Sequence, residues 1–390
     1  MSKNILIIGN GFDLYHKLPT SYKDFLFFTK HWNEFKEEYD KQKKTEMPQN
    51  NKRIKVRLGN RNELTLESLN DFAKHAYLYS KEHITYLDNH VKHNAWLYYF
   101  EAITMPGQNW IDFEEEIYRA LSQVELYYTN FLTSIEHTIP EIIMPDLMKK
   151  VIRTFGEMAE AKKQGYRYLA TRGFTSRMAV PEVLNPNKAL LLDFMKDELD
   201  VLNKCLDYYL LEFVSKIDCD VLSEQIKKLG KIALLNFNYT YTFSAVYGDE
   251  NLDKHHAIHG EAKKENLVLG ISDESFGNSI DFIYFQKFFQ RIQKKTGSFY
   301  KKWLDEYLFS EPLDVFIMGH SLNKVDKGVL QDFFCHEEEV RLITIYYHSQ
   351  SGYENLIINL VDMFGRDFII EQTGKERIVF EELKPPVQKD

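Results

Sequence analysis

Small and polar residues follow the first apolar run of this chain, and their types and spacing suit nucleotide chemistry. The run at 4–8 is followed directly by Gly9, Asn10, Gly11, Phe12 and Asp13. Glycines at such a place lack the Cβ atoms that block a tight turn, so backbone N–H groups can face an anion such as a pyrophosphate. Leu14 replaces the third glycine of a full dinucleotide fingerprint, and an ordinary strand-to-helix turn is the alternative interpretation.

Three later apolar runs also end in small, amide or imidazole side chains. These residues are Asn236, Asn238 and Thr240 after the run at 231–235, His259 and Gly260 after 256–258, and Gly319, His320 and Ser321 after 313–318. In a parallel sheet, ligands bind at the carboxyl ends of the strands. The four strand ends together therefore predict one shared nucleotide pocket.

These motifs resemble the AbiH family of bacteriophage abortive-infection proteins. The resemblance is carried by the strings at 9–14, 18–22, 24–25, 236–240, 259–260 and 319–322, and through the middle of the chain only 109–114 is similar. The resemblance implies a role in phage defence.

More remotely, the pattern is similar to sirtuin-like NAD-binding domains. On this comparison Gly9 and Gly11 match the glycine turn, Asn238 the loop asparagine and His259 the catalytic histidine, and Gly319 with Ser321 matches a later turn that contacts adenosine or phosphate. Thr240 stands where that loop has its acid, and no four-cysteine zinc module follows His259, which argues against a protein deacylase. The resemblance implies NAD as ligand or substrate.

NAD cleavage needs few catalytic groups, because the nicotinamide–ribose bond breaks through an oxocarbenium-like state with a good leaving group. We expect His259 to deprotonate water or a ribose hydroxyl and Asn238 to hold the ribose or the water. The amides of 9–12 would bind the pyrophosphate. Asp13 would bind a ribose hydroxyl or stabilise positive charge, and capping of the following helix is its alternative role. His320 either contacts the ligand or bonds to a carbonyl of the core.

The elements that position these residues alternate between strands and helices after residue 230. Short β-rich runs lie at 4–8, 231–235, 256–259, 267–271, 313–318, 342–347 and 367–370. Helical patterns at 324–334 and 353–363 separate the last three, which predicts parallel crossovers. The predicted fold class is α/β, with a doubly wound, mostly parallel Rossmann-like sheet, and the resemblance implies its sirtuin-like, DHS-like form.

A long helical pattern interrupts this α/β core, because apolar residues recur at helical spacing from about 22 to 229. We expect residues 1–30 and 230–375 to form the nucleotide-binding core and 31–229 to form a large α-helical insertion that contains a basic loop at 41–61. Residues 376–390 are expected to be a polar C-terminal tail. Asp326, near the start of the pattern at 324–334, is predicted to be a first-turn acid favoured by the helix dipole.

Composition limits the function further. The chain has 390 residues, a hydrophobic content of 44% and a net charge of −9, which argues against nonspecific binding to nucleic acid over the whole surface. Three scattered cysteines suit a reducing compartment, and no apolar run approaches the roughly 18 residues of a membrane helix, so we expect a cytoplasmic protein. The expected partners are a nucleotide ligand, a phage-encoded trigger and a second copy of the chain; nucleic acid stays open.

Two other functions compete with NAD hydrolysis. The first is a nuclease or RNA-directed toxin that uses the basic loop and the acidic residues Asp112, Glu114, Glu115 and Glu116. Consecutive helical carboxylates point in different directions, so a solvated helix face is favoured over a metal site and no metal is expected. The second is a sensor that binds a nucleotide or a phage component without turnover.

Overall fold

A parallel sheet forms the centre of the computed structural model, which describes residues 3–42, 53–104, 111–131, 146–161, 188–277, 279–308 and 312–389. Its six strands lie in the order β4-β3-β1-β5-β6-β7, and every neighbouring pair is parallel. Their bounds are β1 Lys3–Ile8, β3 Ile232–Asn236, β4 Leu252–Ala257, β5 Leu313–Met318, β6 Val340–Tyr347 and β7 Ile378–Glu382. A separate antiparallel pair joins β2 (Val221–Leu222) to β8 (Val387–Gln388).

The first strand lies inside the sheet, as its apolar sequence requires. Ile8 pairs with Asn236 of β3 on one side and with Met318 of β5 on the other. This register places the turns that follow β1, β3 and β5 at the same edge, so the predicted convergence of these strand ends is confirmed.

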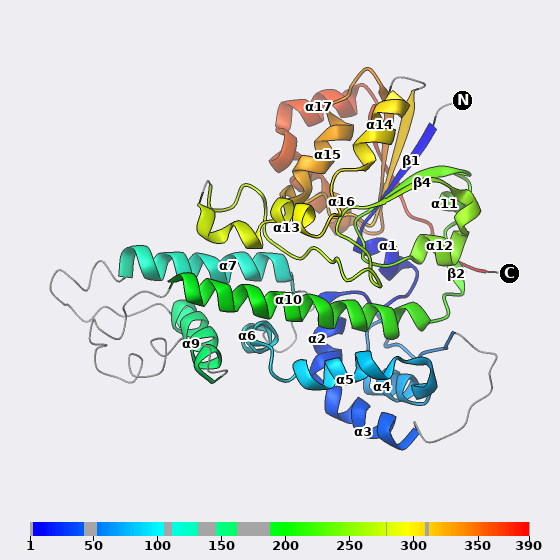
Figure 1. The fold of residues 1–390 in the computed structure, drawn as a ribbon. Coiled ribbons are helices and arrows are strands. Elements are labelled where there is room, and N and C mark those ends of the chain that lie inside the picture. The colour runs from blue at the N-terminus through cyan, green and yellow to red at the C-terminus, as the bar shows by residue number, and fades with distance from the viewer. Residues whose placement is uncertain are drawn as a thin grey trace.

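Helices cover both faces of the sheet, which confirms the predicted doubly wound α/β arrangement. One face packs against α14, α15, α16 and α17, and the other against α1, α11 and α12. The bounds are α1 Asn10–Tyr15, α11 Glu224–Lys227, α12 Thr242–Tyr247, α14 Tyr300–Leu308, α15 Lys327–Phe334, α16 Gln350–Phe364 and α17 Arg366–Gly374. β1 runs down towards α1, which lies directly above α10 (Figure 1).

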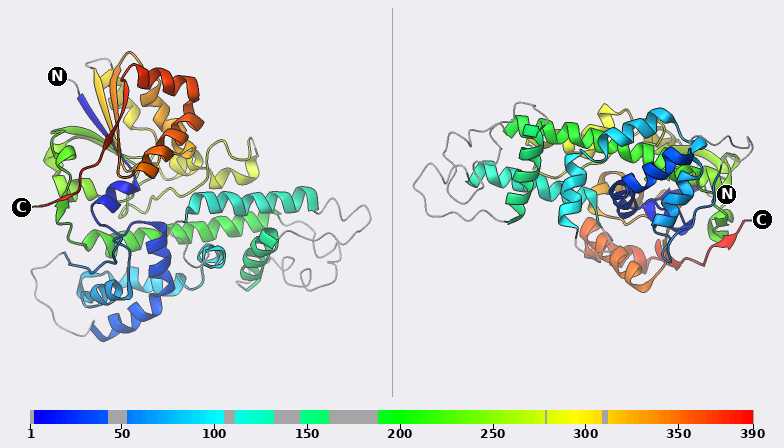
Figure 2. Two further views of the ribbon diagram at one scale, coloured as in Figure 1. Left: turned by 180° about the vertical axis from the view of Figure 1, so that it is seen from behind. Right: turned by 90° about the horizontal axis from the view of Figure 1, so that it is seen from below.

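A large helical block fills the sequence between β1 and β3. Its helices are α2 Tyr22–Lys30, α3 Trp32–Gln42, α4 Leu66–Ala73, α5 Lys81–His90, α6 Ala95–Ile103, α7 Phe113–Leu126, α9 Asp146–Ala161 and α10 Lys188–Glu212. They share one hydrophobic core, to which segment 262–285 of the α/β part also contributes. In Figure 1 and in the left view of Figure 2, α7 and α10 lie between the sheet and the other helices of this block.

Three differences separate the observed strands from the predicted ones: one run is helical, one strand was not predicted, and one run is displaced. Residues 367–370 belong to helix α17, because Gly365 begins a second helix directly after α16 at φ 89°. The sixth strand is instead β7, within the segment 376–390 that was predicted to be a polar tail. The third, the run at 256–259, lies at the end of β4, so His259 follows the strand.

The buried run at 267–271 is also not a strand of the sheet, contrary to the prediction. Leu269 donates its N–H to Gln290 Oε1 and accepts from Gln290 Nε2, at 3.1 and 2.9 Å. A side chain therefore satisfies the backbone groups that a neighbouring strand would bond, and the apolar side chains pack into the helical core.

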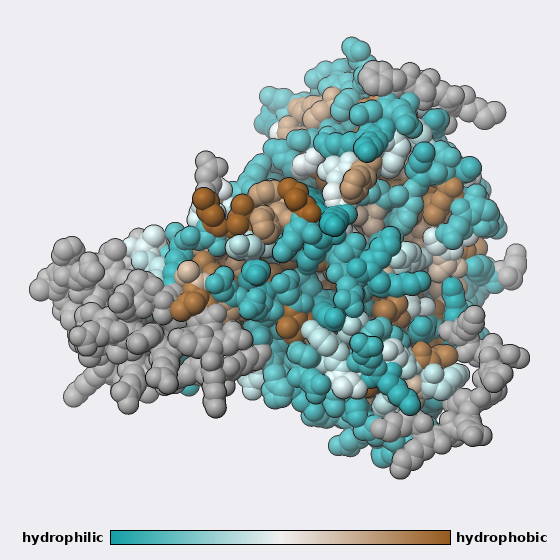
Figure 3. Space-filling model, viewed as in Figure 1, coloured by the Kyte–Doolittle hydropathy of each residue, from teal (hydrophilic) through white to brown (hydrophobic). Residues whose placement is uncertain are grey.

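The surface is mainly hydrophilic on the face shown in Figure 3, with an apolar patch over the segment of η7 (Ile280–Phe285) and α13 (Lys287–Gln293). Ile280 and Ile292 are its most exposed side chains. Among the described residues, no helix is both long and apolar enough to cross a membrane.

Candidate active site

The glycines predicted to cradle a phosphate serve to pack two turns against each other. A Cβ atom on Gly9 would lie 2.7 Å from the Cα of His320, and one on Gly11 would lie 2.7 Å from the Cα of Gly319. Gly319 has φ 70°, and its Cβ would lie 2.0 Å from the backbone nitrogen of Phe12. The turn after β1 and the turn after β5 are therefore in backbone contact, which only glycine permits.

The amides of this turn are engaged within the protein. Gly9 donates to the Met318 carbonyl at 3.2 Å, Gly11 to the Gly319 carbonyl at 2.8 Å, and Phe12 to the Gly9 carbonyl at 2.8 Å. A pyrophosphate would have to displace these hydrogen bonds. In this conformation the turn joins two strand ends and does not present those three N–H groups to an anion.

The asparagine-rich loop after β3 is held by its own side chains. Asn236 Oδ1 accepts from the Asn238 amide at 2.8 Å, and Asn236 Nδ2 donates to the Thr240 carbonyl at 2.9 Å. Asn238 Nδ2 donates to the Gly9 carbonyl at 3.0 Å. The loop is thereby fixed against the glycine turn, with Asn238 at the contact.

Asp13 lies inside α1 and is buried, so it does not cap this helix; the N-cap residue is Gly9. Its Oδ2 accepts from Thr240 Oγ1 at 2.6 Å, and its Oδ1 has no hydrogen-bond partner in the described part of the chain. Burial raises the pKa of Asp13 to about 6, although the bond from Thr240 opposes this shift. Asn10 is engaged separately, through a 2.6 Å bond from Thr20.

His259 forms a buried pair with Asp326. The Nε2 atom of His259 is 3.1 Å from Asp326 Oδ1, and the histidine side chain is only 6% exposed. His320 approaches the other oxygen of the same carboxylate, with Nε2 3.5 Å from Oδ2. The ring of Phe237 packs edge-on against both imidazoles, at centroid distances of 5.4 and 4.3 Å. One carboxylate thus joins the histidine that follows β4 to the histidine that follows β5.

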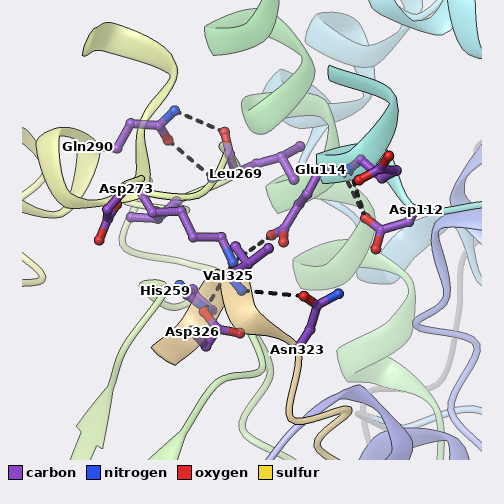
Figure 4. A network of polar contacts seen from close by, with 12 residues as sticks. Asp112, Glu114, His259, Leu269, Asp273, Gln290, Asn323, Val325 and Asp326 are labelled. Carbon is purple, nitrogen blue, oxygen red and sulfur yellow. Dashed lines mark hydrogen bonds and ion pairs between the residues drawn. The ribbon is translucent and has the colours of Figure 1, made fainter. Parts of the chain in front are cut away.

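Lys287 connects this pair to the helical block. Its side chain is 1% exposed, and its Nζ lies 3.2 Å from Asp326 Oδ1 and 2.9 Å from Glu114 Oε1. Glu114 comes from the first turn of α7, where Asp112 caps the helix (Figure 4). The network therefore draws residues from α7, from α13, from the turn after β4 and from η8 (Lys324–Asp326).

The charges of the network are set by burial and by these contacts. Burial alone would raise the pKa of Asp326, but Lys287 and His259 hold it well below its usual range. Burial and the nearby Lys287 lower the pKa of His259 to about 4, against the opposing effect of Asp326. Burial raises the pKa of Glu114 to about 7, in spite of the attraction of Lys287. At neutral pH Asp326 is ionised and His259 is neutral.

A neutral histidine beside an ionised carboxylate has a defined tautomer. Asp326 can only accept, so His259 donates its Nε2–H to it and carries a lone pair on Nδ1. Within the described residues, His259 Nδ1 has no hydrogen-bond partner. This arrangement can accept a proton from a water molecule or a hydroxyl group.

The structure brings most of the predicted site residues together, but not all. Gly9, Gly11, Asn238 and Gly319 are in direct contact, and His320 shares Asp326 with His259, as described above. Thr240 instead bonds to Asp13, and Ser321 is exposed, with its carbonyl accepting from Asn359.

Sequence reasoning missed Lys287, Asp326 and Glu114. Asp326 lies in the first turn of η8 and precedes α15, as predicted, and it is also buried at the centre of the network. Its position seven residues after Gly319, beyond the end of β5, was the available signal. Lys287 stands beside Phe285, Phe288 and Phe289 at the start of a short helix, and this aromatic setting was the available signal that its side chain is buried.

The acidic residues 112 and 114–116 do not converge on one point. Asp112 Oδ1 accepts from the Glu114 and Glu115 amides, Glu114 binds Lys287, and Glu116 binds Arg119 at 3.0 Å. No group of three metal-ligating side chains occurs among the described residues.

Residues 43–52 of the basic loop predicted at 41–61 lie outside the described residues, as do positions 109 and 110 of the similar string at 109–114. In the described part of the loop, Arg57 Nε binds Asp71 Oδ2 at 2.8 Å.

A family model described as bacteriophage abortive infection AbiH matches residues 5–347. No curated protein and no solved structure was found to match the chain. The matched range begins in β1, ends in β6 and includes the helical block with every residue of the His259 network. The chain therefore belongs to the AbiH family and is an antiphage abortive-infection protein.

Proposed function

We propose that the protein hydrolyses NAD, or a closely related nucleotide, at the N-glycosidic bond between nicotinamide and ribose, with His259 as the general base. The observation that carries the proposal is the His259–Asp326 pair, whose Nδ1 lone pair lies at the carboxyl edge of a parallel sheet. The choice of NAD comes from the sequence resemblance of the strand-end motifs to sirtuin-like domains.

The proposed reaction requires one proton transfer. As the C1′–N1 bond breaks, its electron pair neutralises the positive charge of the pyridinium ring, so nicotinamide leaves without a general acid. Water attacks C1′ and gives its proton to His259 Nδ1, which forms ADP-ribose. Asp326 stabilises the resulting imidazolium through the 3.1 Å contact with Nε2.

The surrounding residues prepare His259 for this role. Lys287 keeps Asp326 ionised, which fixes the tautomer in which Nδ1 is the acceptor. Because the pKa of His259 is about 4, the imidazole is neutral at physiological pH. Asn238 lies beside the glycine turn, where its side chain orients the ribose or the attacking water. Since His259 and Lys287 are buried, substrate entry requires surrounding segments to move.

Release of nicotinamide from NAD by the purified full-length chain tests the proposal. His259→Gln should abolish release, and Asp326→Asn should reduce it strongly, about 10⁴-fold by analogy with the orienting aspartate of a catalytic triad. The matched control is His93→Gln, because His93 is an exposed histidine of the helical block and should leave release unchanged. Thermal unfolding with NAD and with ADP-ribose measures binding independently of turnover.

Two results separate this proposal from its competitors. If NAD raises the unfolding temperature of the purified chain, but nicotinamide is released neither in vitro nor in phage-challenged cells, the protein is a nucleotide sensor. Absence of both stabilisation and release would overturn the proposal altogether.

A further inference from the structure

The helix α10 lies next to the segments that follow two strands of the sheet, and two contacts of its C-terminal half define its position. Tyr209 donates to the Pro19 carbonyl at 2.6 Å, beyond the turn that follows β1. Asp207 Oδ1 accepts from the Lys263 amide at 2.9 Å, four residues after His259. Tyr209, two residues later, therefore contacts the segment after β1 from another side of the helix, whereas the face of α10 that carries Asp207 adjoins the segment that follows β4.

Two polar side chains on this face are buried without full hydrogen bonding. Asn203 is 5% exposed, and in the described structure neither its Oδ1 nor its Nδ2 has a hydrogen-bond partner. Asp207 is 1% exposed, and its Oδ2 is likewise unpaired among the residues described. The two residues are four positions apart, which places them one above the other on the same helix face.

The electrostatics of this face also favour a polar ligand. Burial raises the pKa of Asp207 to about 6, against the bond from the Lys263 amide. Asp200, one turn further towards the N-terminus, has a raised pKa for the same reason. Lys294 is the nearby cation, and its Nζ donates to the Leu267 carbonyl. The positive charge of Lys294 thus lies near the carboxylates of Asp200 and Asp207, while the Asn203 amide stays unpaired.

A structural role does not explain Asn203. A buried amide without partners costs folding free energy, and leucine, which has the same branched arrangement of side-chain heavy atoms, would avoid that cost. An amide can, however, donate and accept side by side, which matches the edge of a planar group that carries one donor and one acceptor. In NAD, the carboxamide of the nicotinamide ring and the N6–N7 edge of adenine both have this pattern.

We propose that Asn203 and Asp207 form a substrate-binding site between α10 and the carboxyl edge of the sheet. Asn203 binds a carboxamide-like donor–acceptor edge of the dinucleotide, and Asp207 accepts a hydrogen bond from a ribose hydroxyl, a role that carboxylates commonly have in dinucleotide sites. This inference rests on the proposed function, because it takes NAD as the ligand. It assigns to the helical block a direct part in substrate recognition.

Binding constants for the full-length chain test this site. We expect Asn203→Leu and Asp207→Asn each to weaken NAD binding at least tenfold, with nicotinamide release by Asn203→Leu falling through KM more than through kcat. Asn203→Leu should also keep or raise the unfolding temperature, whereas a purely structural role would lower it. Asp193→Asn, at an exposed position of α10, is the matched control and should change neither quantity.

The affinities for four ligands show which edge of NAD Asn203 binds. If Asn203 binds the carboxamide, the wild-type chain prefers NAD to nicotinic acid adenine dinucleotide, Asn203→Leu loses that preference, and ADP-ribose binding is unchanged. If Asn203 binds adenine, NAD and ADP-ribose weaken equally in the variant, and the wild-type chain discriminates against nicotinamide hypoxanthine dinucleotide.

If Asn203→Leu and Asp207→Asn both bind NAD as tightly as the wild-type chain does, the inference is overturned. A wild-type chain that binds NAD but releases no nicotinamide would refute only the proposed hydrolysis, since the affinities still decide the role of Asn203. A chain that binds neither NAD nor ADP-ribose would overturn both.

Discussion

Replacing Lys287 by methionine should raise the pKa of His259 towards the physiological pH range. Methionine keeps most of the volume of the lysine stem and removes the only charge that contacts both Glu114 and Asp326 in the described network. Lys287 lowers the pKa of His259, and Asp326 raises it. In the variant Lys287 no longer lowers this pKa, while Asp326 still raises it against burial and Arg291, so the pKa of His259 must rise.

The structure gives the size of this effect. Lys287 Nζ and His259 Nε2 both approach Asp326 Oδ1, at 3.2 and 3.1 Å, so they are at most about 6 Å apart. At that distance and an effective dielectric constant of about 20, one unit charge changes the energy of another by about 3 kcal/mol, or roughly two pKa units. The pKa of His259 should therefore rise from about 4 to about 6. Breaking a buried ion pair should also cost about 3–5 kcal/mol of unfolding free energy.

Histidines labelled with ¹³C at Cε1 report this pKa directly by NMR, with His259→Gln used to assign the signal. The wild-type signal should stay constant above about pH 5, whereas the signal of Lys287→Met should titrate near pH 6. Lys287→Arg keeps the charge and is the control, with a pKa close to that of the wild type. An unchanged or lowered pKa in a folded Lys287→Met chain would refute the assigned role of Lys287.

Three further predictions concern stability. Because the pKa of Glu114 is raised to about 7, the contribution of its carboxyl group to the free energy of unfolding is complete below about pH 4.5 and is lost as the pH rises through 7. Glu114→Gln should therefore remove about 3 kcal/mol of the pH dependence of this free energy, measured by unfolding in urea. The same sign applies to Asp13, whose pKa is about 6, so Asp13→Asn should become more stable relative to the wild type as the pH rises from about 4 to 7. Equal slopes of unfolding free energy against pH in the two chains would contradict this. Gly319→Ala should destabilise the chain by several kcal/mol, because its Cβ would overlap Phe12, whereas Gly365→Ala, also at positive φ but in open space, should cost only about 1 kcal/mol.

The sequence was sufficient to predict the central strands and the meeting of their ends. β1, β3 and β5 are short apolar runs bounded by glycine or asparagine, and runs of this kind favour buried parallel strands. Once they pair, geometry alone places Gly9, Asn236 and Gly319 at one edge. The register of Ile8 with Asn236 and Met318 shows this directly.

The errors arose where an apolar run had two possible partners. Residues 267–271 are apolar enough for a strand, but they pack on the helical block, where Gln290 satisfies the backbone of Leu269. Residues 367–370 are apolar on one helix face as well, and Ile369 uses that face against α16 and the sheet. Local pattern does not distinguish these outcomes, because the deciding contacts lie far away in the sequence.

The candidate site was predictable only for residues that terminate strands. His259 follows a strand closely and was found, whereas its partner Asp326 is 67 positions later and Lys287 stands in a short helix. Their importance comes from burial: a lysine side chain is normally solvated, and only the folded chain encloses Lys287 between two carboxylates. A buried charge needs a partner, and nothing in the local pattern names it.

The same burial argues that the α/β part cannot supply the site alone. Glu114 reaches Lys287 from the helical block, and Asp207 reaches the segment after β4 from α10. In the other direction, Leu267, Leu269 and Phe282 of the α/β part pack into the core of the helical block. Separating the two parts would expose that core and leave Asp326 and Lys287 without their enclosure. The helical block is therefore one wall of the site, and a movement of α7 would act on His259 through Glu114, Lys287 and Asp326.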